Sequence, residues 1–492
     1  MEGCKYEGCG HGTYFAGYAR PAPQKVLGGG RAILAQDSRN RTHQEHVRHG
    51  TAVEKGLESE EQSGVKGVSC IAKMLPYFNV VKGFPIAVGH AFLLGVVSAF
   101  LDTVLADYKT EGERPNHVVT KANRRKMSAR HGRLVWTHEH GRPAKDVVKY
   151  RASMTMEELL VFVETASLYV FLGCLLKELE TAWFHLRRAV MHYCRISDGG
   201  MDEARRERAK ADVAKYASIV EEVIGPQMCT MNLHQAVRHA YEQETATGST
   251  AKSMEWFVEQ HVGELKKRVA GMTREPHKVV GNDVLLEKAL TDRVTEKPHF
   301  RALVGLDEER EPEAFKGPTD VPEEGVQLLH VGQPLGASQL SPDELASLQN
   351  HAETVGFTTD VQRWEIHEFR AARVGDQAYQ SRARYRTAAR HSFNVSISWS
   401  SSQTRKRTEH FATLERFLRV QDSASAGVLR IATGTVYKQA RAEKGLSVLD
   451  AAQPLKVGEV IPLESIESKV VFAPHDEQQG KMYVLPCFSR DL

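Results

Sequence analysis

PYFNVVKGFPIAVGHAFLLGVVSAFL, residues 76–101, is the stretch on which the fold depends. It is largely apolar, with one histidine near its middle and Asp102 directly after its end. Between Ile86 and Leu101 the one ionisable side chain is His90. This run holds 16 residues, whereas a membrane-spanning helix needs about 20. The length therefore predicts a buried helix, and a membrane-associated helix is the alternative.

A second apolar run extends from Leu159 to Leu176. Glu164 falls inside it, and Glu157 and Glu158 come just before it. An ionisable group at membrane depth is costly, which argues against a membrane-spanning helix. We therefore expect both runs to be buried helices in the core of a large soluble body.

The composition is typical of a folded protein with more than one domain. The 492 residues are enough for two or three hydrophobic cores. With 65 basic and 62 acidic residues the formal charge is +3, so any nucleic-acid binding must come from local patches. The seven cysteines are odd in number and scattered, which favours a reducing compartment. The start, MEGCKYEGCGHG, lacks the apolar segment of a secretory signal.

Residues 37–64 are polar and lack periodicity, which predicts an exposed loop, and helical periodicity begins at about residue 88 and continues to about residue 269. Val213, Tyr216, Val220 and Val223 form an apolar stripe at helical spacing, with Arg and Glu on the other face. Gly225-Pro226 ends that helix. We expect helices over Val88–Leu105, Met156–Cys194 (as one or two helices), Asp202–Ile224, Met231–Tyr241 and Ser253–Val269.

The pattern changes after about residue 390. Phe393, Val395, Ile397 and Trp399 alternate with polar residues, as in a half-buried strand. Several short β-runs separated by Pro and Gly follow, which predicts a small barrel or sandwich. The expected fold class is thus mainly α with a β-rich C-terminal module.

Several segments follow one another in a recognisable order. CKYEGC near the start precedes GVKGVSCIAKMLPYFNVVKGFPIAVGHAFLLGVV, then EELLVFVETASLYVFLGCLL, and then MNLHQAVRHAYEQETATGSTAKSMEWFVEQHVGELKKRV. Over about residues 4–300, and again over the last 80, this order resembles the C-terminal half of CACTA (En/Spm-type) transposases. The resemblance implies a partial RNase H-like DDE core with a long helical insertion.

The resemblance, for the first two, and the composition and periodicity, for the last two, predict four parts. Residues 1–105 form a cysteine-containing segment and the edge of the catalytic core, and residues 106–300 form the helical insertion with its return helix. Residues 301–390 form a partly disordered linker, since 306–326 are acidic and hold several prolines. Residues 391–492 form the small β-rich domain.

A pair of histidines is the most specific part of the pattern. His234 and His239 are five residues apart, and on a helix both reach one metal ion only if the helix ends or bends there. The resemblance implies a structural zinc held by Cys4, Cys9, His234 and His239, a set that suits tetrahedral zinc. The family has Cys-x2-Cys, whereas here Glu7 stands where the second cysteine is expected. Ordinary histidines and free thiols are the alternative.

The resemblance assigns one catalytic residue, Glu259, as the third carboxylate of the DDE set. Such an enzyme needs three carboxylates to hold two Mg²⁺ ions that activate water and a 3′-hydroxyl. The family's two aspartates usually precede the cysteine pair, and Ala87 stands where an aspartate is common three residues before His90. We therefore expect a catalytically incomplete transposase, with Mg²⁺ relevant only to a complete core. A solvated helix residue is the alternative for Glu259.

Two basic runs are candidates for DNA contacts through phosphate neutralisation. A solvated charged face is the alternative for each run, and KANRRK also resembles a nuclear-localisation signal. The candidate residues are Lys121, Arg124, Arg125, Lys126, Arg130 and Arg133 in the first run, and Lys266, Lys267 and Arg268 in the second.

Three functional hypotheses follow. The first is a nuclear, DNA-contacting, transposase-derived protein that is inactive alone, without a membrane partner. A second copy of the chain or a separate N-terminal transposase portion would be its further partner. The second is a non-enzymatic host protein of that origin that binds DNA or another protein. The third is an unrelated helical protein associated with membranes.

Overall fold

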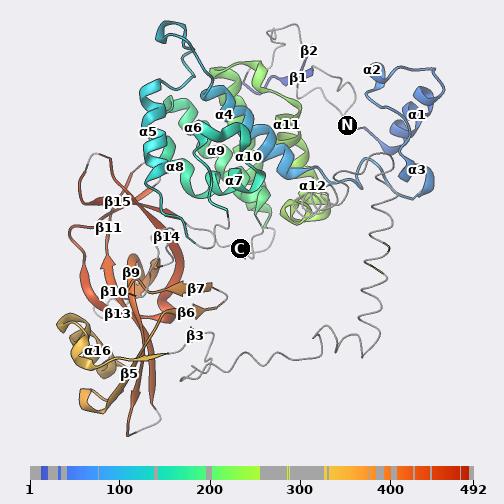
Figure 1. The fold of residues 1–492 in the computed structure, drawn as a ribbon. Helices are drawn as coiled ribbons and strands as arrows, with labels where there is room; N and C mark the ends of the chain where they lie inside the picture. Colours follow the sequence, from blue (N-terminus) through green and yellow to red (C-terminus); the bar gives the residue numbers. More distant parts are fainter. Residues whose placement is uncertain are drawn as a thin grey trace.

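The computed structural model describes most of the chain as a helical body, residues 86–254, and a β-module, residues 326–486 (Figure 1). The expected helix Ser253–Val269 falls almost entirely outside the described residues. The described residues are 13–19, 31–34, 41–75, 77–137, 142–195, 202–254, 285, 288, 326–329, 332–375, 377–383, 393–400, 407–424, 427–443, 446–476 and 478–486.

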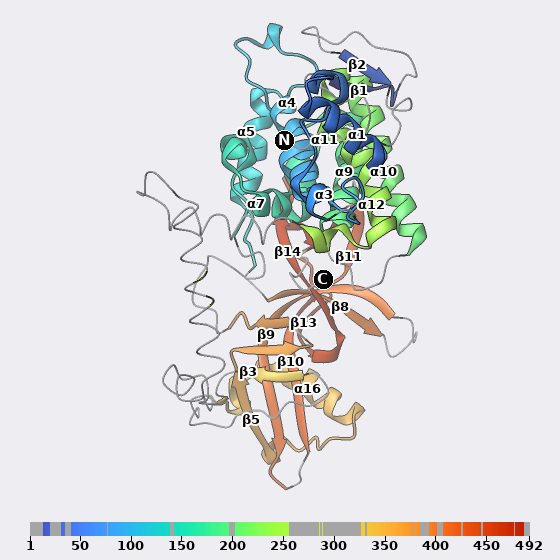
Figure 2. The same ribbon diagram turned by 90° about the vertical axis from the view of Figure 1, so that its right-hand side faces the viewer.

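Short elements precede the helical body, and the helices among them lie on one side of it (Figures 1 and 2). Thr42 begins the first helix with a capping box, in which its hydroxyl accepts from the Glu45 N–H and the Glu45 carboxylate accepts from the Thr42 N–H. The elements are the parallel strands β1 (Thr13–Ala16) and β2 (Arg31–Leu34), and the helices α1 (His43–Glu54), α2 (Glu60–Ser63) and α3 (Cys70–Met74).

The apolar stretch of residues 76–101 contains the predicted buried helix. A π-helical segment, η2 (His90–Val97), continues directly into α4 (Ser98–Val104), and Phe92 and Phe100 are fully buried. Its neighbours in the helical body cover most of its surface. No helix in the described parts of the chain is long and apolar enough to span a membrane.

The other helical segments surround η2 and α4. The helix expected over Asp202–Ile224 is confirmed as α10, which stops before Gly225, where a positive φ of 126° favours glycine. The segments are η3 (Glu111–Glu113), α5 (Lys121–Gly132), α6 (Val147–Tyr150), η5 (Arg151–Ser153), α7 (Met156–Val161), the π-helical η6 (Phe162–Ala166), α8 (Ser167–Phe171), α9 (Lys177–Cys194), α10 (Glu203–Val223), η7 (Pro226–Met228), α11 (Met231–His234), the π-helical η8 (Gln235–His239), α12 (Ala240–Thr247) and η9 (Thr250–Ser253).

Glu164, the acidic residue of the second apolar run, is buried in η6 with its charge paired. Arg195 at the end of α9 forms an ion pair with its carboxylate. Arg187 donates to the carbonyl oxygens of Val163 and Glu164, at 3.0 and 2.7 Å. Burial raises the pKa of Glu164, and the Arg195 charge opposes that rise. The carboxylate thus belongs to the protein core.

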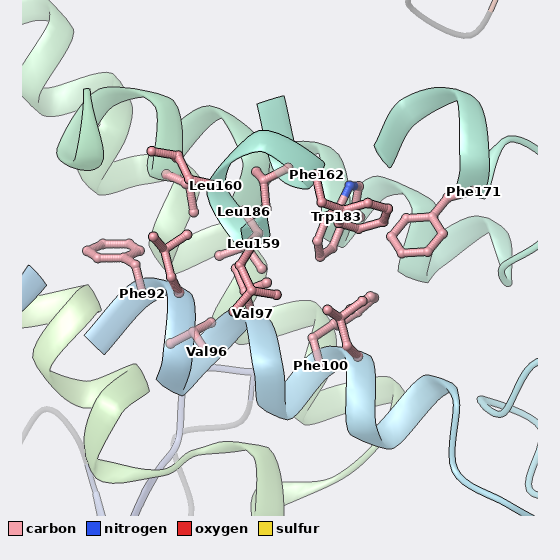
Figure 3. Packing of buried hydrophobic residues seen from close by; sticks show 14 of the residues in the cluster. Phe92, Val96, Val97, Phe100, Leu159, Leu160, Phe162, Phe171, Trp183 and Leu186 are labelled. Carbon is pink, nitrogen blue, oxygen red and sulfur yellow. The ribbon is translucent and has the colours of Figure 1, made fainter. Parts of the chain in front are cut away.

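Aromatic side chains fill the centre of the helical body (Figure 3). Trp183 of α9 is 1% exposed. Its ring centroid lies 5.2 Å from that of Phe100, 6.1 Å from that of Phe162 and 4.9 Å from that of Phe171. These rings come from α4, η6, α8 and α9, so one contact cluster joins the two apolar runs of the sequence.

The β-module is built on an open antiparallel sheet, so the barrel part of the prediction is wrong. Its strands run in the order β11-β12-β15-β14-β8-β9-β10-β13. Strand β5 also pairs with β9, and β4 pairs with β5. Strands β3, β6 and β7 form a separate sheet. Helix α16 packs on β13, at one end of this path. The elements are β3 (Val326–Leu329), β4 (Gln333–Pro334), η10 (Ala337–Gln339), α16 (Pro342–Thr354), η11 (Val361–Arg363), β5 (Trp364–Phe369), β6 (Ala371–Val374), β7 (Gln377–Gln380), β8 (Asn394–Ser400), β9 (Arg407–Asp422), β10 (Val428–Tyr437), β11 (Gln439–Glu443), β12 (Leu446–Asp450), β13 (Lys456–Pro462), η12 (Leu463–Ser465), β14 (Ile466–Pro474) and β15 (Lys481–Pro486).

Much of the expected linker, 301–390, belongs to this module. Strands β3 to β7 and helix α16 all lie within it. A local signal for α16 is present: Ser341 and Glu344 form a capping box, and Pro342 occupies the first helical turn. The acidic, proline-containing composition upstream obscured this helix start.

The helical body and the β-module share one hydrophobic cluster. Val471 of β14 and Tyr483 of β15 belong to the same cluster as Val104 and Met127, so the expected division after residue 105 falls within a continuous core. Figure 2 shows β14 next to the helical body. Before residue 326, β1 and β2 are the strands of the described chain, and the RNase H-like core stays a prediction.

Candidate functional site

A π-helical turn places the two predicted zinc-binding histidines side by side. Helix α11 begins after Thr230, whose hydroxyl accepts from the Leu233 N–H, and runs through η8 into α12. In a π-turn the hydrogen bonds join residues five apart, which brings residues i and i+5 onto one face. The ring centroids of His234 and His239 are 5.5 Å apart, with the planes at 84°. The turn provides the bend that this spacing requires.

Both histidines face the interior of the helical body. His234 is 1% exposed and His239 is 4% exposed. The Oε2 oxygen of Glu242 lies 3.7 Å from Nδ1 of His239, which is an ion-pair distance and longer than a hydrogen bond. Within the described residues no group of three or more His, Cys, Asp or Glu side chains could hold a metal ion. The two imidazoles would therefore need partners from elsewhere in the chain.

The apolar stretch of residues 76–101 supports the histidine helix directly. Segment η2 packs against α11, and a methyl group added at Gly95 would lie 2.5 Å from the side chain of Asn232. Gly95 therefore permits a close approach of two helices that a larger residue would push apart. His90, at the start of η2, is partly buried, in agreement with a packed histidine.

An N-terminal segment lies beside this helix. Strand β1 packs against α11 and against η7. The backbone N–H groups of Gly17 and Ala19 each donate to the Glu221 carboxylate at 2.8 Å. Burial, and next the neighbouring Cys229 and Glu221, raise the pKa of the Tyr18 hydroxyl. Residues 13–19, called the N-terminal strap below, are thus seated on α10 and α11.

Glu221 was missed from the sequence, although a weak signal was present. It lies one residue after Val220 of the apolar stripe and four after the buried Ala217, so helical periodicity places its carboxylate on the inward side of α10. Nothing local indicates its partners, which lie about 200 residues away in the chain.

The first basic run is a helix whose cations are largely engaged within the protein. Arg124 donates to the carbonyl oxygens of Val119 and Ala106 and to the Asp107 carboxylate. Lys121 lies over the Tyr108 ring, with Nζ 5.3 Å from the centroid. The side chains of Lys121 and Arg125 are exposed.

Three further cations of this run converge on one carboxylate of the β-module: Lys126 and Arg130 in α5, and Arg133 directly after it. Arg130 Nε donates to Asp476 Oδ2 at 2.6 Å, and Arg133 Nη1 donates to Asp476 Oδ1 at 3.2 Å. Lys126 Nζ lies 3.7 Å from the same Oδ2. We call Asp476 with these three cations the Asp476 clamp. It joins α5 to the turn between β14 and β15.

Arg130 is the buried centre of the clamp. Its Nη1 also donates to the carbonyl oxygens of Val170 and Leu172, at 3.2 and 2.6 Å, and its guanidinium lies 5.6 Å from the Tyr169 centroid. The Tyr169 hydroxyl in turn donates to the carbonyl oxygen of Pro474 at 2.9 Å. Part of the basic run expected to bind DNA therefore holds the β-module against the helical body.

The remaining predicted site residues lie outside the described residues. These are Cys4, Cys9, Glu259, Lys266, Lys267 and Arg268. Of the predicted zinc ligands the structure brings His234 and His239 together.

No protein-family model, curated protein or solved structure matches this chain.

Proposed function

We propose that this chain is a nuclear, DNA-contacting protein derived from a CACTA-type transposase, in which His234 and His239 hold a structural zinc ion together with Cys4 and Cys9. The observation that carries the proposal is the π-turn of η8, which puts two histidines five residues apart on one face.

The position of the N-terminal strap supports the ligand set. Thr13 follows Cys9 by four residues, and four residues span at most about 14 Å. Since β1 packs against the helix that ends at His234, this chain length is compatible with the proposed approach of Cys9 to the histidine pair. Zinc bound there would join the start of the chain to the end of the helical insertion, closing a long loop.

Replacing either histidine with alanine should abolish zinc binding. Purified wild-type protein is expected to carry about one zinc per chain, because two imidazoles and two thiolates complete a tetrahedral set. His234→Ala and His239→Ala should carry almost none, whereas His239→Cys should retain part of it and Gln235→Ala, on the same turn, should match wild type. Metal content is measured by mass spectrometry after desalting, with circular dichroism to confirm folding. Zinc-free wild-type protein, or full zinc in both alanine variants, would contradict the ligand assignment.

DNA contact is assigned to the exposed cations of the first basic run. The three cations of the Asp476 clamp face one carboxylate, so positive charge is in excess at this joint. Lys121 and Arg125, which are exposed on the same helix, extend this positively charged surface. Cleavage would require Glu259 with two further carboxylates and Mg²⁺, and we propose binding without strand cleavage.

The double variant Lys121→Ala/Arg125→Ala should bind duplex DNA more weakly, and to a similar extent for different sequences. Each lost phosphate contact reduces the slope of log K against log salt by about 0.9, so the slope should fall by roughly 2. Fluorescence anisotropy over a salt series measures it, and Lys55→Ala/Lys82→Ala on the N-terminal elements serves as the control. An unchanged slope would remove these two residues from the interface.

A second candidate is a non-enzymatic protein that binds another protein through the β-module. The Asp476 clamp favours it, since three cations of the basic run already have a structural task. If the protein does not bind DNA at low salt and leaves DNA uncut both with and without Mg²⁺, this candidate is favoured over the first.

A further inference from the structure

We propose that Glu221 is a positioning residue that anchors the N-terminal strap on α10, beside the helix that bears His234. The inference deepens the proposed zinc site, and the anchoring itself is measurable whether or not zinc binds. Glu221 lies near the end of α10, is 2% exposed, and accepts from two backbone N–H groups of the strap.

A buried carboxylate needs compensation, and the strap supplies it. Burying an ionised carboxyl is unfavourable unless hydrogen bonds satisfy its oxygens. Oε1 accepts from Gly17 and Oε2 from Ala19, each at 2.8 Å, so each carboxylate oxygen has its own donor. Hydrogen bonds to a charged acceptor are about twice as strong as neutral ones. The strap and the carboxylate therefore stabilise each other, although the strap has only short elements of its own.

Tyr18, between the two donors, adds a second attachment. Its side chain packs against the main hydrophobic cluster of the helical body, near Cys229 and Arg238. Strand β1, directly before it, lies on α11. On the proposed zinc site, release of the strap would loosen the chain that leads to Cys9, and Glu221 would then help to set how firmly zinc is held.

Glu221→Gln tests the anchor while preserving side-chain shape. Glutamine keeps one acceptor oxygen, but its NH₂ group faces the second strap N–H, so one donor loses its acceptor. Hydrogen–deuterium exchange in the full-length protein should become faster by about tenfold or more for the peptide covering residues 13–19. Glu222→Gln, at the neighbouring exposed position, should exchange like wild type.

Zinc content after dialysis gives the second readout. Glu221→Gln should lose zinc faster than wild type and Glu222→Gln should not. Unchanged exchange in Glu221→Gln would overturn the proposal, and faster exchange with unaltered zinc loss would overturn its link to the histidine pair. If wild-type protein holds no zinc, the proposed function fails, and the exchange comparison still decides whether Glu221 anchors the strap.

Discussion

Asp476→Asn is expected to lower the free energy of unfolding by about 3 kcal/mol. Removing one partner of a buried ion pair typically costs about 3–5 kcal/mol, because the remaining charge stays buried without compensation. Arg130 is 3% exposed, so its guanidinium cannot turn to water in the folded chain. It keeps the carbonyl oxygens of Val170 and Leu172 as acceptors, which places the expected cost at the lower end of that range.

Urea unfolding followed by circular dichroism measures this loss. The matched control is Asp107→Asn, which removes another Asp–Arg pair, with Arg124 at 3.1 Å, from a position where the aspartate side chain is 92% exposed. An exposed ion pair contributes about 0–1 kcal/mol, so the control should unfold almost like wild type. Equal stability of the two variants would show that the clamp does not hold the β-module in place.

The clamp is not the only contact that joins the helical body to the β-module. The shared hydrophobic cluster continues across the joint through Val471 and Tyr483, so loss of the clamp should weaken the joint without separating it. We therefore expect Asp476→Asn to unfold in a single, earlier transition.

Trp183→Ala is expected to be still more destabilising, by about 4–5 kcal/mol. Truncation of a buried tryptophan removes its transfer free energy and leaves a cavity that the neighbours fill only in part. Four segments, α4, η6, α8 and α9, meet at this ring, and Phe100, Phe162 and Phe171 would each lose a packing partner (Figure 3). The folded chain should be only marginally stable after this change.

Phe184→Ala is the matched control, since Phe184 follows in the same helix and is 39% exposed. Its loss should cost well under 1.5 kcal/mol, because a partly exposed ring gains little from burial. The two variants are compared by thermal and urea unfolding. A similar, small effect of both would mean that the aromatic cluster does not form the centre of the core.

Periodicity along the chain was enough to predict the two longest helices that the structure describes, α9 and α10, whereas α1 lies within residues 37–64, which were expected to form an exposed loop. The stripe of Val213, Tyr216, Val220 and Val223 is local information, because residues three and four apart share a helix face. The same applies to the alternation of Val395 and Ile397 in β8 with Phe393 directly before it. The linker prediction was wrong for α16. It extended the acidic, proline-containing composition of residues 306–326 to the residues that follow and did not use the capping residue Ser341 as the start of a helix.

The candidate site was predictable in its residue types and not in its geometry. The spacing of His234 and His239 indicated that the helix must bend between them. In the structure the bend is the π-turn η8, and the preceding helix α11 packs against η2 at Gly95. The partners of Glu221 and Asp476 had no local signal. These carboxylates meet groups about 200 and 340 residues away in the chain, and the order of neighbours in a sequence carries no record of such pairs.

The amino-acid sequence by itself indicated the helices with a clear apolar stripe, the alternating strand β8 and which apolar faces must be buried, because these depend on contacts between near neighbours. The tertiary structure alone decided that the basic run α5 holds the β-module, that the sheet stays open, and that the N-terminal strap lies against α11, the helix that ends at His234. Those outcomes depend on which buried charge finds which partner, and that is settled only when distant segments pack together.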